Sequence, residues 1–285
     1  MRLTSFRNKG DSRDRWGVVQ LQQDGDGIAE LTDADTTISD ICEAISDLAR
    51  LKQLASDMPI THALDEVELL PVIPEPQKTI CIGLNYGSHV KETGRDWPEY
   101  PIIFTRYPQT HVGHGQPLVR PKLSERFDYE GELAFVIGKG GRHIPAEKAL
   151  DHVAGYTCYN DGSIRDYQRH TSQFMPGKNF WRSGSMGPWL VTSDEIPDPS
   201  ILHLTTRLNG EMMQDADLSD LIFDVPAIVA YVSGFLELSP GDVIATGTTG
   251  GVGAFHQPPR WMKPGDTIEV EISGIGTLAN GIVDE

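Results

Sequence analysis

The sequence is poor in cysteine and in long apolar runs. Its three cysteines, Cys42, Cys81 and Cys158, lie far apart with no CxxC spacing. A disulfide framework and a thiolate zinc site are therefore not expected, and buried apolar positions are expected instead. No segment approaches the ~20 apolar residues that span a bilayer, and the first residues lack the apolar run of a signal peptide. We therefore expect a cytoplasmic protein without a membrane partner.

Basic residues are also scarce. Lys and Arg total 24 against 41 Asp and Glu, which gives a formal net charge of −17 at pH 7. A balance of this sign repels nucleic acid and anionic membranes, so neither is an expected partner. An anionic substrate would need a local source of positive charge in such a protein. A bound divalent cation could supply that charge.

The chain is predicted to divide near Pro71. An alternating segment over residues 16–22 predicts a strand, and apolar residues recur at helical spacing in the stretch that follows it. Three prolines within residues 70–76 then stop regular structure. We therefore predict a small N-terminal α+β domain over residues 1–71 and a larger domain over residues 72–285.

The larger segment has a mainly β pattern. Short apolar runs of strand length recur along it, and only two stretches have helical periodicity. We expect an α+β protein with more strand than helix. The predicted strands cover residues 79–84, 133–137, 189–191, 243–246 and 268–272, and the predicted helices cover residues 145–152 and 225–235.

The segment over residues 127–138 carries the most informative chemical pattern. Glu130 and Glu132 share one face of a predicted strand, because side chains alternate with period two, and apolar residues continue both faces. Two unpaired carboxylates at the entrance to a core strand would be costly. Their spacing suits oxygen ligands of one hard cation. The alternative is a frayed strand start with both carboxylates in water.

A third carboxylate lies where a predicted strand turns into a helix. Asp161 at this turn could be a metal ligand or simply the helix N-cap. Within the helix, Arg165 and Gln168 are three residues apart and share a face. They could hold an anionic substrate, or they could form a solvated surface pair.

Two further candidates lie in loops or short turns. His89 precedes Glu92 by three residues on a predicted helical turn, where a carboxylate would orient the imidazole for taking a proton from water. An exposed pair on a helix is the alternative. Lys178 follows a Met-Pro-Gly stretch and could bind an anion or lie in solvent. The glycine-rich segment 246–253 matches neither the dinucleotide fingerprint nor a Walker loop.

Taken in order, these motifs resemble the fumarylacetoacetate hydrolase family from about Lys78 to the C-terminus. Each motif is weak alone, but their common order is specific. The motifs are Ile82-Gly-Leu-Asn-Tyr with His89 and Glu92, Glu130-Gly-Glu, Gly155-Tyr with Asn160-Asp161, Arg165-Asp-Tyr-Gln168, Gly177-Lys178, Gly187-Pro-Trp, Leu208-Asn-Gly-Glu, Pro240-Gly-Asp-Val-Ile and Thr246-Gly-Thr.

The resemblance implies a fold and a set of functional residues. The fold is a mixed β roll or sandwich with flanking helices, usually in a homodimer. One departure is Thr249, which stands where the family often has proline after Thr-Gly-Thr. Position by position, the resemblance implies a Mg²⁺ or Mn²⁺ site at Glu130, Glu132 and Asp161, catalytic roles for His89, Glu92 and Lys178, and substrate contacts from Arg165, Gln168 and Thr248.

On this basis we expect a metal-dependent hydrolase that acts on a small anionic oxo-acid. The expected reaction cleaves a carbon–carbon bond of a 3-acylpyruvate, such as maleylpyruvate or fumarylpyruvate from aromatic ring cleavage, to pyruvate and a carboxylic acid. His89, oriented by Glu92, would deprotonate the attacking water, and Lys178 with Gln168 would stabilise the oxyanion. An alternative keeps the metal but makes the protein a 2-oxo acid decarboxylase or an isomerase of an unsaturated oxo-diacid. A catalytically idle homologue is a third possibility.

Overall fold

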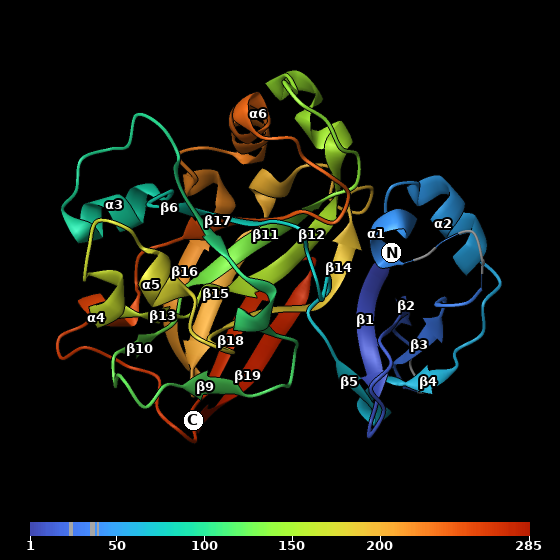
Figure 1. Cartoon of the computed structure of the whole chain (residues 1–285), viewed down its shortest axis with the longest axis horizontal. Coiled ribbons are helices and arrows are strands. Elements are labelled where there is room, and N and C mark those ends of the chain that lie inside the picture. Colours follow the sequence, from blue (N-terminus) through green and yellow to red (C-terminus); the bar gives the residue numbers. More distant parts are fainter. Residues whose placement is uncertain (23–24, 35–37, 39) are drawn as a thin grey trace.

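One large sheet runs through the computed structural model, which describes residues 1–22, 25–34, 38 and 40–285 (Figure 1). Two short strands, β5 (Val67–Leu69) and β8 (His111–Val112), pair with it off the main path. In spatial order, the main path is β4 (His62–Ala63), β3 (Gly27–Glu30), β2 (Arg15–Gln20), β1 (Arg2–Asn8), β14 (Gly184–Thr192), β12 (Val153–Asn160), β11 (Gly131–Ile137), β17 (Val243–Thr248), β6 (Thr79–Gly83) and β7 (Ile102–Arg106).

The central strands are covered on both faces. Every residue of β11 and β12 is buried. On β11, Leu133 and Phe135 belong to the core cluster that includes α6 (Val225–Phe235), and Ala134 belongs to the cluster that includes the N-terminal strands. Burial on both faces explains why these strands are continuous apolar runs rather than alternating ones.

A second sheet packs against the first. In spatial order, it consists of β16 (Glu211–Asp217), β15 (His203–Leu208), β18 (Thr267–Ile272), β19 (Gly276–Asp284) and β9 (Leu118–Arg120). Side chains of β15 alternate between buried and half-buried, as expected of a strand with one face toward the core. The prediction of a mainly β, α+β protein of roll or sandwich type is confirmed.

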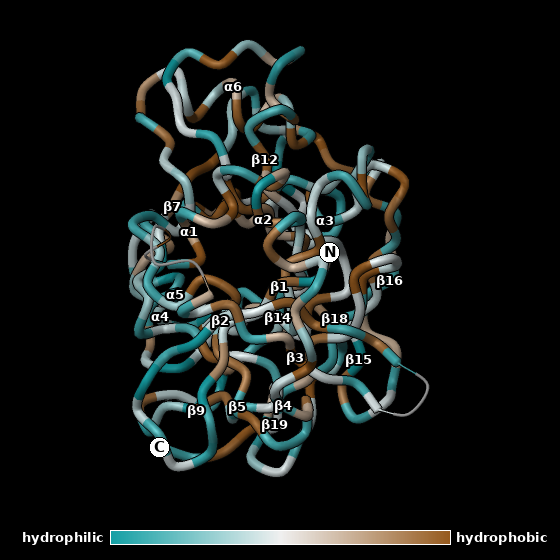
Figure 2. The backbone as a smooth tube through the Cα atoms, turned by 90° about the vertical axis from the view of Figure 1, so that its right-hand side faces the viewer, coloured by the Kyte–Doolittle hydropathy of each residue, from teal (hydrophilic) through white to brown (hydrophobic). Residues whose placement is uncertain are grey.

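The N-terminal segment continues the large sheet. Leu3 of β1 pairs with Leu190 of β14 in antiparallel register, and Figure 2 places the two strands side by side. Helices α1 (Ile41–Ala44) and α2 (Leu48–Ala55) belong to the same segment and begin at the N-caps Asp40 and Asp47. The division into residues 1–71 and 72–285 stays a prediction, because the strands of the two segments hydrogen-bond directly to each other.

Five short elements lie near the site discussed below and carry several of its polar residues. Among the helices of the described residues, none is long and apolar enough to cross a membrane. The short strands β10 (Phe127–Asp128) and β13 (Ser163–Ile164) pair antiparallel, with β10 just before β11 and β13 just after β12. Three short helices lie near them: α3 (Gly87–Thr93), α4 (Arg165–Gln168) and α5 (Met175–Lys178).

Candidate active site

A cavity of about 630 Å³ opens beside the ends of the central strands, and most of the predicted site residues line it. Glu92 and Asp161 do not line it, but each is bonded to a side chain that does. The predicted residues that line the cavity are His89, Glu130, Glu132, Arg165, Gln168, Lys178 and Thr248.

Three buried carboxylates converge at the inner end of this cavity. Glu130 precedes β11, Glu132 lies within β11, and Asp161 follows the neighbouring strand β12. The antiparallel register pairs Glu132 with Tyr159, and the Asp161 amide donates to the Glu130 carbonyl at 2.8 Å. One oxygen from each carboxylate lies within 4.8 Å of the others, and the residues are 6%, 1% and 0% exposed, respectively. Asp161 is therefore not a helix N-cap, since α4 begins four residues later.

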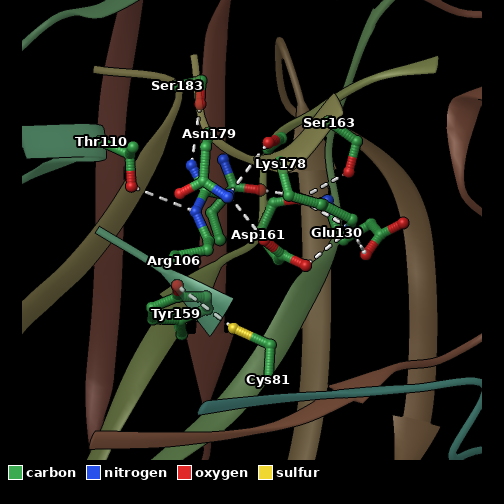
Figure 3. Close-up of polar contacts among 12 residues, drawn as sticks. Cys81, Arg106, Thr110, Glu130, Tyr159, Asp161, Ser163, Lys178, Asn179 and Ser183 are labelled. Atoms are coloured by element: carbon green, nitrogen blue, oxygen red, sulfur yellow. Dashed lines mark hydrogen bonds and ion pairs between the residues drawn. The ribbon is translucent and has the colours of Figure 1, made fainter. Parts of the chain in front are cut away.

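Three cations neutralise two of these carboxylates, and Figure 3 shows two of the cations, Lys178 and Arg106, beside Asp161. Lys178 Nζ lies 2.6 Å from both Glu130 Oε2 and Asp161 Oδ2. Arg165 Nη1 lies 2.5 Å from Glu130 Oε1, and Arg106 Nη1 lies 2.5 Å from Asp161 Oδ1. Burial alone would raise the pKa of Glu130, but the charges of Lys178 and Arg165 lower it to about 2. Glu130 is therefore ionised at neutral pH.

Glu132 is the carboxylate without a cationic partner among the described residues. Its Oε2 accepts a hydrogen bond from the Gly247 amide at 2.9 Å. Burial, and next the charges of Asp161 and Glu130, raise the pKa of Glu132 well above its usual range. A cation placed among the three carboxylates would remove this repulsion.

The charge balance of the cluster also fits a divalent ion. Carboxylate oxygens are the hard donors that Mg²⁺ and Mn²⁺ accept. The buried cluster has one more carboxylate than it has cations, so a divalent ion would convert an excess of one negative charge into an excess of one positive charge. This suits an anionic substrate in a protein of net charge −17. The buried charges counted are Asp128, Glu130, Glu132 and Asp161 against Arg106, Arg165 and Lys178.

The imidazole of His89 is held beside the same cavity. Its Nδ1 lies 2.9 Å from Glu92 Oε2, within α3. The other oxygen of Glu92 accepts from the Gly251 amide at 2.9 Å. The ring of Phe255 packs edge-on against His89 at a centroid distance of 6.2 Å. No described residue hydrogen-bonds to Nε2, and His89 is only 6% exposed, so this is not the solvated surface pair that the sequence also allowed.

Arg165 lines the cavity and has one donor without a partner among the described residues. Its Nε donates to Asp128 Oδ2 at 2.7 Å, and its Nη1 also donates to Gln168 Oε1 at 2.9 Å. Its Nη2 is buried and has no partner among the described residues. A buried guanidinium nitrogen without a partner is costly, and the carboxylate of a ligand in the cavity would satisfy it.

The two threonines at the end of β17 take up structural contacts. Thr248 Oγ1 donates to the Gly131 carbonyl at 2.9 Å and accepts from Gln214 Nε2 at 2.7 Å. Thr249, the residue that replaces the usual proline, places its hydroxyl 3.0 Å from the Ser88 hydroxyl at the start of α3. The substitution therefore adds a side-chain contact between this loop and the helix that carries His89.

Two buried charges at the site were missed by sequence reasoning. Arg106 is 2% exposed, and besides Asp161 it donates to Ser183 Oγ at 2.8 Å. No spacing pattern connects it to Asp161, because the two residues are far apart in the chain. Asp128 is fully buried. It could have been found, since it is two residues before Glu130 in a run of acidic residues with period two.

Comparisons with known proteins identify related sequences. A family model described as fumarylacetoacetate (FAA) hydrolase, C-terminal, matches residues 78–283. Oxaloacetate tautomerase YisK of Bacillus subtilis is 45% identical over 225 residues, which cover 78% of this chain and 75% of that protein. The mitochondrial oxaloacetate tautomerase fahd2 of Xenopus laevis is 38% identical over 291 residues, covering 99% and 90%.

The solved structure of a related protein contains a divalent metal ion. Maleylpyruvate hydrolase from Sphingobium sp. SYK-6, in complex with manganese(II) and pyruvate, has a TM-score of 0.81 and 28% identity, covering 100% of this chain and 99% of that one. With the three converging carboxylates, it confirms the prediction of a divalent-metal cofactor.

The predicted hydrolysis of a 3-acylpyruvate is wrong. The two curated relatives described above, at 38% and 45% identity, are both named as oxaloacetate tautomerases. The physical reason for the error is that these reactions share a metal site and an enolate of a 2-oxo acid, so the motifs that hold these parts do not distinguish the reactions. The isomerase alternative agrees better with the relatives.

Proposed function

The chain belongs to the fumarylacetoacetate hydrolase family, and we propose that it is a divalent-metal-dependent tautomerase that interconverts the enol and keto forms of oxaloacetate. The names of relatives that cover most of the chain support this choice of reaction. The observation that carries the proposal is that one cavity is lined by Glu130 and Glu132 of the carboxylate cluster, by His89 and by Arg165, and that Nη2 of Arg165 has no partner among the described residues. The homodimer suggested by the family resemblance is retained as part of the proposal.

The reaction needs few parts. From enol to keto, one proton leaves the C2 hydroxyl and one proton is added at C3. No carbon–carbon bond breaks and no water is consumed. The protein must therefore hold two negatively charged carboxylates, favour the ionised C2 oxygen and exchange a proton at C3.

Positive charge at the inner end of the cavity would favour the ionised form of the substrate's C2 oxygen. When bound, a divalent cation held by Glu130, Glu132 and Asp161 would supply Lewis-acid charge to the substrate oxygens. The ammonium group of Lys178 fixes two of these carboxylates and adds positive charge next to them. Burial would lower the pKa of Lys178, but Asp161 and Glu130 raise it, so the group stays charged.

Arg165 and Gln168 are proposed to bind a carboxylate of the substrate. Arg165 Nη2 is the unused donor of a guanidinium that Asp128 and Glu130 hold in place. Gln168 accepts from Arg165 through Oε1, which leaves its amide NH₂ group to donate. Thr248 lines the same wall of the cavity and keeps β11 in place through its bond to the Gly131 carbonyl.

His89 is proposed to exchange the proton at C3. The carboxylate of Glu92 accepts from Nδ1, which fixes the tautomer and leaves Nε2 to face the cavity. An imidazole held in this way has the geometry of a general acid or base. Phe255 shields the pair on one side, which limits competing proton exchange with water.

The test is metal-dependent loss of the enol form, followed by ultraviolet absorbance. Protein stripped with a chelator should not accelerate ketonisation, and addition of Mn²⁺ or Mg²⁺ should restore acceleration. A control with the same metal and no protein is required, because free ions also catalyse the reaction. If metal-loaded protein shows no acceleration above that control, the proposed activity is wrong.

A further inference from the structure

Asp128 hydrogen-bonds to Arg165, which is proposed to bind a substrate carboxylate, and also to the 251–255 loop beside the cavity. Its side chain is fully buried and accepts four hydrogen bonds. Oδ2 accepts from Arg165 Nε at 2.7 Å and from the Ala254 amide at 3.0 Å. Oδ1 accepts from the Gly253 amide at 2.8 Å and from the Tyr129 amide at 3.0 Å. Burial raises the pKa of Asp128, and the charge of Arg165 and these hydrogen bonds offset part of that rise.

These bonds leave Asp128 no direct chemical role. Each carboxylate oxygen already accepts two hydrogen bonds, so neither has a lone pair in good geometry for a metal ion or a substrate proton. Asp128 is also not among the carboxylates that converge on the metal position. Its influence on the reaction must pass through the groups that it holds.

The loop held by Asp128 is the one that covers His89. The short 3₁₀ turn η6 (Gly253–Phe255) carries Phe255, whose ring packs against the imidazole. A Cβ added at Gly253 would lie 2.5 Å from Asp128 Oδ1 and 1.9 Å from the Arg260 carbonyl, so the loop is tightly seated on the carboxylate.

A second carboxylate holds the start of the same loop. Glu92 accepts from the Gly251 amide through Oε1 while it binds His89 through Oε2. The loop is therefore bonded to two carboxylates, and each of them also orients a group of the active site. Asp128 orients Arg165, and Glu92 orients His89.

We propose that Asp128 is a positioning residue that sets the orientation of Arg165 and seats the 251–255 loop, so that substrate binding and closure of the site over His89 depend on one carboxylate. This inference rests on the proposed function in one respect, the role of Arg165 in binding a substrate carboxylate. Its structural half, the seating of the loop, does not depend on any activity.

Amide hydrogen exchange tests the structural half. In Asp128→Asn, the amides of Gly253 and Ala254 should exchange about tenfold faster or more, because each loses a bond to a charged acceptor, while the Gly251 amide stays as in wild type. Glu92→Gln is the matched control and should give the opposite pattern. Unchanged exchange at Gly253 and Ala254 in Asp128→Asn would overturn the proposal.

Steady-state kinetics test the functional half. Asp128→Asn should raise KM for oxaloacetate about tenfold with a smaller change in kcat, and its effect on KM should be much smaller in an Arg165→Gln background, where only the loop contribution remains. An equal rise of KM in both backgrounds would show that Asp128 does not act through Arg165. If the exchange pattern is as expected but no oxaloacetate turnover exists even in wild type, the proposed function fails and the loop seating stands.

A loop variant keeps the test valid if Asp128→Asn does not fold. Ala254→Pro removes the amide that donates to Asp128 and lies in the half-buried 3₁₀ turn, away from the core. It should raise KM at least threefold. Ala254→Gly retains the amide and should keep KM within twofold of wild type. Equal KM values for the two variants would overturn the proposal.

Discussion

At the residue scale, several polar side chains of the site are each oriented by another side chain. His89 is held by Glu92, Arg165 by Asp128, and Asp161 by Arg106. These supporting bonds are short and most of them are buried, so each restricts its partner to one orientation. The cost of burying so many charges is offset only when every one of them is paired, and Glu132 is the exception that a cation resolves.

The role of His89 gives the first expected outcome. His89→Ala should lower kcat for the enol-to-keto reaction by about 100-fold or more, the usual contribution of a positioned acid–base group. Binding of Mn²⁺, measured by titration calorimetry, should not change, because His89 does not contact the three carboxylates. Activity within threefold of wild type would exclude His89 as the group that exchanges the proton.

A buried histidine outside the cavity gives a pH dependence. Burial, together with the charge of Arg106, lowers the pKa of His111 well below 6.5. The unfolded chain therefore takes up a proton below about pH 6.5 that the folded state does not. The free energy of unfolding therefore has its full value, as far as His111 is concerned, above pH 6.5 and decreases as the pH falls below 6.5.

The corresponding variant is His111→Gln. Its amide can still reach the Tyr159 hydroxyl, which lies 2.6 Å from His111 Nε2. From pH 6 to pH 5, the free energy of unfolding should fall by about 1 kcal/mol less in the variant than in wild type. Urea unfolding at the two pH values measures this. Equal pH slopes would mean that His111 is not kept neutral by the fold.

At the element scale, the site depends on strands that meet at one edge and on tight contacts between segments. A Cβ at Gly113 would lie 2.1 Å from the Leu69 carbonyl, where the end of β8 meets the end of β5. The N-terminal strands are therefore seated directly on the catalytic part of the chain.

Substitution of this glycine tests the seating. Gly113→Ala should destabilise the protein by about 1–3 kcal/mol, the usual cost of overpacking a rigid contact. Gly234→Ala in α6 is the matched control, because nothing lies within 4 Å of its added Cβ. The control should be neutral or slightly stabilising, since alanine is the better helix former. Thermal unfolding compares the two, and similar midpoints would contradict the close contact.

Much of the element pattern could be predicted from the sequence. The apolar runs at 79–84, 133–137, 243–246 and 268–272 correspond to β6, β11, β17 and β18, and residues 225–235 form α6. Other helix predictions were less accurate because tertiary contacts override periodicity in short segments. Residues 146–152 form a 3₁₀ helix, and the helical run between 41 and 58 is broken into α1 and α2.

Part of the site could also be predicted, because local periodicity identifies residues that lie close together in the chain. Period-two alternation identified Glu130 and Glu132 because both lie at the start of one strand. Helical spacing identified His89 with Glu92, since the pair lies within one turn. Arg106 could not be found, because its contact with Asp161 depends on how β7 and β12 are arranged in the folded chain. Long-range partners of this kind leave no local pattern.

At the scale of the whole molecule, a net charge of −17 is combined with a cavity that needs positive charge. The metal resolves this conflict and joins segments that are far apart in the sequence. Its three carboxylates lie at the junction of β10, β11 and β12, next to both core sheets. Metal binding should therefore contribute to folding stability as well as to activity.

Metal removal tests this coupling. Mn²⁺ at 100 times its dissociation constant should stabilise the folded protein by about 2.7 kcal/mol, and a chelator should abolish the effect. Glu132→Gln should largely remove the stabilisation. Glu237→Gln, an exposed carboxylate elsewhere, should retain it. Thermal unfolding with and without Mn²⁺ measures the effect, and equal responses of the two variants would contradict the assignment of Glu132.

The most direct test of tautomerase activity is to identify the product when metal-loaded protein acts on the enol form of oxaloacetate, followed by NMR. The expected result is rapid formation of keto oxaloacetate with all four carbons retained, while pyruvate and carbon dioxide form no faster than in buffer with metal alone. Formation of pyruvate and carbon dioxide at the rate of enol loss would show that the protein is a decarboxylase and would contradict the tautomerase assignment.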